Sequence, residues 1–269
     1  MYNGPLKYEF TDIEHPHVPG LYRIRALRDI DRHSVMRGNL GGYIEDDCNL
    51  SHRGDCWVGG DAIVKEEASV QDNAYAGHEA FLTGQARLWN NTYALNKTEM
   101  FDRACAYDNA VLKGGTRMIN HSQVHGRARI TDANLSFGAS ISENAHVNGG
   151  ATVAGDVAIG NHAYISAGAY ITRTDHVLHA TVMGSDMFGA TMYRTRDNGA
   201  KLFVGCWEGT LEEFRTMIES DTWVEASPRK IELRRPEMLA FISMCEARVA
   251  TWDDEPATPT RTSADNTHK

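Results

Sequence analysis

Three side chains that could bind a small anion recur at nearly equal intervals in the second half of the chain. They are Arg129, His146 and Tyr164, separated by 17 and 18 residues. A guanidinium and an imidazole donate hydrogen bonds to carboxylate or phosphate oxygens, and a tyrosine ring adds stacking. Arg117 could add positive charge, so these four residues form our candidate ligand site. The alternative is that they are ordinary solvated side chains or members of ion pairs.

The spacing of these residues follows from a six-residue repeat in the middle of the chain. Each unit is a triplet of one small residue, any residue and one aliphatic residue, as in Ala62-Ile63-Val64 and Ala163-Tyr164-Ile165. Thirteen copies run in register from Cys56 to Ala128, one residue is lost before Ala133, and seven copies follow. In a strand, the first and third residues of a triplet point inward and the middle one outward. A fixed six-residue period predicts a parallel β-helix.

The repeat and its flanks carry a resemblance to a known family. The repeat resembles the left-handed hexapeptide β-helix, which implies three faces per coil and about seven coils. The flanking segments Tyr22–Leu27 (YRIRAL), Gly38–Glu45 (GNLGGYIE), Asn49–His52 (NLSH) and Gly205–Phe214 (GCWEGTLEEF) are similar to an uncharacterised bacterial and prophage family of β-helix proteins. Members are often labelled hexapeptide transferases by fold analogy. The resemblance implies an all-β solenoid, namely a left-handed parallel β-helix.

The extent of the repeat divides the chain into four parts. We expect an N-terminal β cap at 1–52, the β-helix at 53–183, a C-terminal α+β cap at 184–252 and a disordered polar tail at 253–269. In the C-terminal cap, Asp197-Asn198-Gly199 predicts the turn of a hairpin. Thr210 and Glu213 form a capping box that opens a helix, and a second helix is expected from about Pro236.

Every third triplet stacks, so the outward residues sort onto three faces. The first face carries Trp57, Tyr75, Tyr93, Val111, Arg129, His146 and Tyr164; the second carries Ile63, Phe81, Glu99, Arg117, Asn134, Thr152 and Tyr170; the third carries Ser69, Arg87, Cys105, Gln123, Ser140, Ala158 and His176.

The first face is therefore rich in aromatic side chains, and contiguous exposed apolar area indicates an interface. We expect Trp57, Tyr75, Tyr93 and, from the second face, Phe81 to contact another subunit. The implied assembly is a homo-oligomer, most often a trimer in hexapeptide proteins. The alternative is that the chain's own terminal segments cover these rings.

Composition limits the possible partners and compartments. The net charge of −9 argues against a protein that binds nucleic acid directly through a basic surface. No apolar run resembles a signal peptide or a membrane span, so we expect a cytoplasmic location. The five cysteines lack metal-ligand spacing, and neither a metal nor a cofactor is expected.

Several functions fit this pattern. We favour a non-catalytic, homo-oligomeric binding protein of prophage type that captures an anionic or nucleotide-like molecule in a subunit-interface or cap pocket. One alternative is a hexapeptide acyltransferase with His146 as the base, although no loop interrupts the repeats. A zinc lyase of the γ-carbonic anhydrase type would need three imidazoles that converge on the zinc ion. His121 and His125 lie four residues apart, and their side chains need not converge. The last alternative is an acidic rod that binds a basic protein by resembling DNA.

Overall fold

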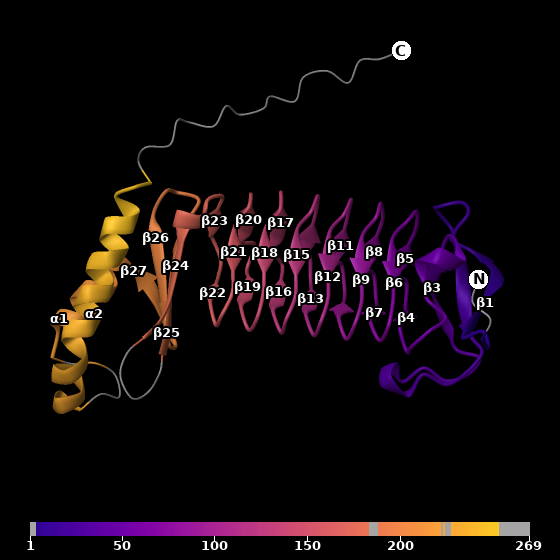
Figure 1. The fold of residues 1–269 in the computed structure, drawn as a ribbon, viewed down its shortest axis with the longest axis horizontal. Helices are drawn as coiled ribbons and strands as arrows, with labels where there is room; N and C mark the ends of the chain where they lie inside the picture. The colour runs from indigo at the N-terminus through magenta and orange to yellow at the C-terminus, as the bar shows by residue number, and fades with distance from the viewer. Residues whose placement is uncertain (1–3, 183–187, 222, 224–226, 253–269) are drawn as a thin grey trace, which may run out of the picture.

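A parallel β-helix forms the centre of the molecule, and a cap lies at each end of it (Figure 1). The computed structural model describes residues 4–182, 188–221, 223 and 227–252. The predicted disordered tail at 253–269 lies outside these residues. The expected solenoid fold, with about seven coils and two caps, is confirmed.

Three parallel sheets form the walls of the coil. The first face has seven strands: β4 (Trp57–Val58), β7 (Tyr75–Ala76), β10 (Tyr93–Ala94), β13 (Val111–Lys113), β16 (Arg129–Thr131), β19 (His146–Asn148) and β22 (Tyr164–Ile165). The second face has β5 (Ile63–Val64), β8 (Phe81–Leu82), β11 (Glu99–Met100), β14 (Arg117–Met118), β17 (Asn134–Ser136), β20 (Thr152–Ala154) and β23 (Tyr170–Ile171). The third has β6 (Ser69–Val70), β9 (Arg87–Leu88), β12 (Cys105–Ala106), β15 (Gln123–Val124), β18 (Ser140–Ile141) and β21 (Ala158–Ile159).

The observed register confirms the predicted stacking. Trp57 lies opposite Tyr75, which lies opposite Tyr93, so one coil takes 18 residues. His176 is the exception to the predicted faces, because it lies buried in the turn η3 (Thr174–His176) beyond the last strand of the third face. The chain leaves the repeat pattern there, since Asp175 occupies a position at which the coil requires a small residue.

The corners between strands need a left-handed backbone, which explains their composition. At least one residue in each corner has positive φ, for example Asp72 (56°), Asn90 (56°) and Asp108 (63°). Asparagine, aspartate and glycine tolerate this conformation best. The corners also bind one another, because Asp72 Oδ2 accepts a hydrogen bond from Asn90 N at 3.1 Å and Asp108 Oδ2 accepts one from Gly126 N at 3.0 Å.

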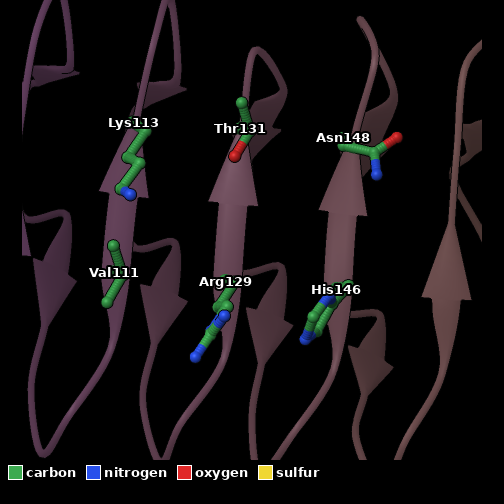
Figure 2. A pocket seen from close by; sticks show the side chains of 6 residues that line it. All are labelled: Val111, Lys113, Arg129, Thr131, His146 and Asn148. Atoms are coloured by element: carbon green, nitrogen blue, oxygen red, sulfur yellow. The ribbon is translucent and has the colours of Figure 1, made fainter.

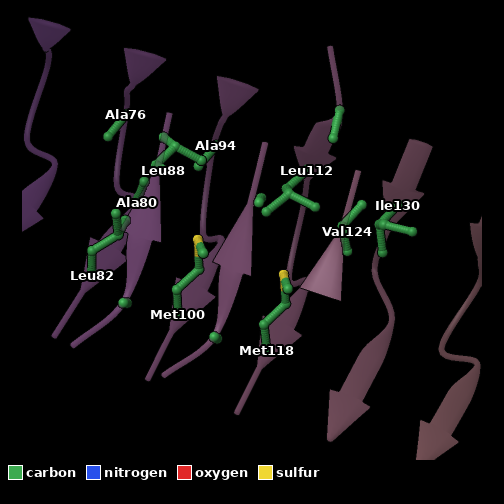
Figure 3. Close-up of a cluster of buried hydrophobic side chains, with 14 of the residues drawn as sticks. Ala76, Ala80, Leu82, Leu88, Ala94, Met100, Leu112, Met118, Val124 and Ile130 are labelled. Carbon is green, nitrogen blue, oxygen red and sulfur yellow. The ribbon is translucent and has the colours of Figure 1, made fainter. Parts of the chain in front are cut away.

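The interior of the coil is narrow and apolar. Alanine side chains alternate with larger aliphatic ones such as Leu82, Met100 and Leu112, and all are fully buried (Figure 3). Thr92 and Thr116 occupy two of the small positions, where each hydroxyl donates to the carbonyl three residues earlier, at 2.7 and 2.6 Å. These hydroxyl groups inside the coil thereby have hydrogen-bond partners, and the coil does not have to widen to hold them.

The one-residue deletion before Ala133 is absorbed in a single corner. Asp132 adopts φ 53°, and its Oδ1 accepts a hydrogen bond from Gly115 N in the preceding coil at 2.7 Å. Arg117 still pairs with Asn134, so both neighbouring faces keep their register. The shortened corner follows β16 directly, on the first face.

The N-terminal cap extends one wall of the coil. The strands β1 (Tyr8–Glu14), β2 (Tyr22–Ala26) and β3 (Leu40–Ile44) continue the second face, and β3 pairs in parallel with β5. Between β2 and β3, the turn η1 (Asp31–His33) reaches the first face, where Arg32 donates to Asn91 Oδ1 at 2.9 Å. The turn η2 (Asp47–Asn49) then leads into the first coil.

The C-terminal cap is larger than the predicted hairpin. Four antiparallel strands form its sheet: β24 (Val177–Val182), β25 (Phe188–Arg194), β26 (Ala200–Val204) and β27 (Trp207–Thr210). Because β24 pairs with β25, the cap begins near residue 177 and not at 184 as expected. The Asp197-Asn198-Gly199 turn joins β25 to β26.

Two helices cover one side of this sheet. Helix α1 (Leu211–Glu219) begins at the predicted capping box of Thr210 and Glu213. Helix α2 (Pro228–Val249) starts eight residues before the expected Pro236, because Ser227 caps it and Pro228 occupies its first turn. Among the described residues, no helix is long and apolar enough to cross a membrane.

Phe137 provides a test of the preference of left-handed corner positions for asparagine, aspartate and glycine. It adopts φ 54° although it is a bulky residue, and it is 64% exposed, so little burial offsets the strain. We expect Phe137→Asn to stabilise the fold by about 1 kcal/mol. Chemical denaturation would measure this gain. The matched reverse change, Asn120→Phe, lies in the same corner one coil earlier and should destabilise the fold. A loss of stability in Phe137→Asn would contradict the preference for asparagine at these positions.

Candidate functional site

The first face contains a shallow pocket at its centre. Its volume is about 370 Å³, and its lining comes from three successive strands: Val111 and Lys113 of β13, Arg129 and Thr131 of β16, and His146 and Asn148 of β19. Figure 2 shows these side chains in two parallel rows, one of Val111, Arg129 and His146 and one of Lys113, Thr131 and Asn148. The rows follow from strand geometry, since residues two apart point to the same side.

The pocket lining is cationic and rich in hydrogen-bond donors. Lys113 and Arg129 are exposed, and neither forms an ion pair with the part of the chain that the structure describes. The lining includes no carboxylate. Thr131 and Asn148 add a hydroxyl and an amide. An arginine, a lysine and neutral donors in one depression can hold a carboxylate or phosphate group.

The surroundings of His146 favour the neutral form of its imidazole. Burial, followed by the nearby charge of Arg129 and by His162, lowers its pKa below the usual 6.5. A neutral ring has one N–H that can donate to an anion and one nitrogen that can accept a proton. The same ring therefore suits ligand binding and the proton removal that an acyltransferase would require.

The structure brings together two of the four predicted ligand residues. Arg129 and His146 are neighbours in register and both line the pocket. Tyr164 lies one coil further on, but its ring stacks on Phe203 of the C-terminal cap at 4.0 Å. Its hydroxyl accepts a hydrogen bond from Asn148 Nδ2 at 2.8 Å, so Tyr164 orients a pocket residue instead of lining the pocket.

Arg117 does not belong to the pocket. It lies on β14 in the second face, 3.6 Å from Glu99 Oε2, with its guanidinium 5.0 Å from the centre of the Phe101 ring. Arg117 cannot line this pocket, because neighbouring triplets face different walls of the coil.

Three pocket residues, Lys113, Thr131 and Asn148, are not among the residues predicted from the sequence. Each stands two residues after an outward residue of the first face, so it also points outward. The alternation of side chains along a strand carries the signal for them, whereas the triplet rule marks only the middle residue of each strand. These three strands are also one residue longer than most others in the coil.

The N-terminal cap covers the start of the aromatic stripe. Trp57 is only 1% exposed, and Gly41 packs so closely that a Cβ there would lie 2.7 Å from Trp57 Cζ2. The prediction that Trp57 contacts another subunit is therefore wrong. The His33 ring lies 4.9 Å from Tyr75 and 5.9 Å from Tyr93, and its Nε2 contacts Asn73 O at 3.1 Å.

Phe81 lies apart from these rings on the second face. It contacts Phe101, with ring centres 5.8 Å apart, and remains partly exposed. With Trp57 buried at one end and Tyr164 stacked on Phe203 at the other, the open part of the first face runs from Tyr93 to His146.

His33 should make the stability of the cap depend on pH. Burial lowers the pKa of His33 below 6.5, so the folded state binds a proton less readily than the unfolded state. Stability should therefore fall as the pH drops below about 6.5. We expect His33→Gln to flatten this dependence in thermal unfolding between about pH 8 and about pH 5.5. An unchanged slope would show that His33 does not contribute.

The comparisons with known proteins agree with this architecture. Residues 138–173 match the family model described as bacterial transferase hexapeptide (six repeats). The matched segment spans β18 to β23 and includes His146 and Asn148 of the pocket. No curated protein matches the chain. The six-residue repeat, the three parallel walls and the match over residues 138–173 together identify the coil as a left-handed parallel β-helix of the hexapeptide-repeat type.

Proposed function

We propose that the protein is a homo-oligomeric binding protein that holds a small anionic or nucleotide-like molecule against the centre of its first face. The observation that carries this proposal is the pocket of Lys113, Arg129 and His146, in which two fixed cations lack a protein counterion among the described residues. Clustering cations costs free energy through mutual repulsion, and a bound anion removes that cost.

The composition of the pocket favours an oxyanion. Lys113 supplies a compact charge, while Arg129 can donate two parallel hydrogen bonds to one carboxylate or phosphate. Val111 offers an apolar contact at the edge of the same depression. A pocket of about 370 Å³ is of the size that small-molecule sites have.

The shallowness of the pocket supports an oligomer. Small ligands are usually bound in clefts that bury most of their surface, which one open wall of a coil cannot do. A second copy packed on the exposed stretch between Tyr93 and His146 would close the pocket. The caps leave this stretch open, so the proposed trimer would meet there and not along the whole aromatic stripe.

Capture without turnover would suit a prophage protein that sequesters a host metabolite. The resemblance of the flanking segments to a prophage family supports this role.

Removal of a pocket cation should weaken anion binding. We expect Arg129→Ala to reduce the affinity for inorganic pyrophosphate or AMP about tenfold or more, since a hydrogen bond to a charged group contributes about 1.5–3 kcal/mol. Isothermal titration calorimetry would measure this. Arg117→Ala is the matched control, because it removes the same charge from the second face. Equal losses in both variants, or no binding by the wild type to either anion, would argue against the pocket.

The oligomer has its own test. Val111 is partly exposed at the centre of the open stretch. We expect Val111→Arg to dissociate the assembly, because a third cation beside Lys113 and Arg129 would be buried at the interface without a counterion. Native mass spectrometry would report the change in mass. The control Ala158→Arg places the same charge on the exposed third face and should leave the mass of the assembly unchanged. A wild-type monomer would overturn the proposed assembly.

A further inference from the structure

A lysine and a cysteine are buried against each other where the N-terminal cap meets the first coil. Lys7 is 0% exposed, and its Nζ lies 3.0 Å from Cys56 Sγ and 2.7 Å from Cys56 O. Lys7 directly precedes β1, and Cys56 directly precedes β4. From this contact we propose that peroxide converts the pair into a covalent sulfenamide crosslink between Lys7 Nζ and Cys56 Sγ.

The surroundings hold the two groups together. Lys7 N donates to His52 Nδ1 at 3.2 Å, and the His52 ring stacks on Tyr8 with centres 4.3 Å apart. The Tyr8 hydroxyl donates to Leu50 O at 2.9 Å. These contacts fix the backbone on both sides of the Lys7 side chain, so Nζ stays beside the sulfur.

The electrostatics of the pair suit both steps of the reaction. Burial lowers the pKa of Lys7, which favours the neutral, nucleophilic amine. Burial raises the pKa of Cys56, while the adjacent Lys7 acts in the opposite direction. Nζ and Sγ are in hydrogen-bond contact at 3.0 Å, so transfer of the thiol proton to the amine gives a thiolate beside an ammonium.

The chemistry balances with hydrogen peroxide as the only oxidant. The Cys56 thiolate attacks one peroxide oxygen, the O–O bond breaks, and the departing hydroxide takes a proton from the Lys7 ammonium to form water. Sulfur is oxidised to a sulfenic acid and the peroxide is reduced. The neutral amine then attacks the sulfur, an N–S bond forms, and the S–O bond breaks. The leaving hydroxide takes a proton from nitrogen and departs as a second water.

The crosslink would join the N-terminal cap to the coil. It closes a loop between residues 7 and 56, which contains β1, β2, β3 and the turn that covers the aromatic rings. A covalent link of this kind restricts the unfolded chain, so the oxidised protein should unfold at a higher temperature. A thiol reductant should reverse the effect by cleaving the N–S bond.

Mass spectrometry of the full chain tests the proposal directly. After treatment with hydrogen peroxide and digestion by trypsin, we expect residues 1–23 to be joined to residues 54–65, with a mass about 2 Da below the sum of the two peptides. Dithiothreitol should separate them. Cys105→Ala should keep the crosslink, because Cys105 lies on the third face, away from Lys7.

Two outcomes would overturn the proposal. One is a Cys56 sulfinic acid beside an unmodified Lys7. The other is an unmodified Cys56 after the exposed Cys48 and Cys206 have been oxidised. Both are measured on the wild-type protein, so neither depends on the folding of a variant. Cys56→Ser, where it folds, should lose the crosslinked peptide pair and the reversible rise in unfolding temperature.

Discussion

The parallel hydrogen-bond ladder between successive coils is the constraint on which the rest of the structure depends. Most strands of the coil contain only two residues, so none has stability of its own. Each is held by bonds to the coils on either side, such as Trp57 N to Ala74 O at 3.0 Å and Tyr75 N to Thr92 O at 2.9 Å. Because equivalent residues must meet, small residues stack on small ones and aliphatic residues on aliphatic ones.

The same ladder builds the candidate site. Residues that are remote in sequence, such as Lys113 and Asn148, lie in one row because they have the same place in their coils. A β-helix can thus gather charge on one wall without a loop or an insertion. Gathering charge in this way costs electrostatic free energy, since Lys113 and Arg129 repel each other across neighbouring strands. The deletion at Asp132 shortens the corner beside this site while leaving the register intact.

The two caps determine how much of the coil can meet a partner. An open sheet or coil end exposes unpaired backbone groups and apolar side chains, which invites uncontrolled association. The N-terminal cap continues a wall of the coil through β3, while the C-terminal sheet places Phe203 on Tyr164. Because the contact between Lys7 and Cys56 lies at the N-terminal end, a crosslink there would strengthen a cap without altering the pocket near Arg129.

The sequence by itself determined the coil, its three faces and the neighbours within each face. These features rest on a period that is repeated locally, so the triplets predicted that Arg129 and His146 would be adjacent. Only the tertiary structure decided which outward side chains stay exposed. Trp57 is covered by Gly41 and Tyr164 by Phe203, and those contacts join segments that the repeat does not relate. Periodicity fixes the direction of a side chain, whereas its burial depends on packing against distant parts of the chain.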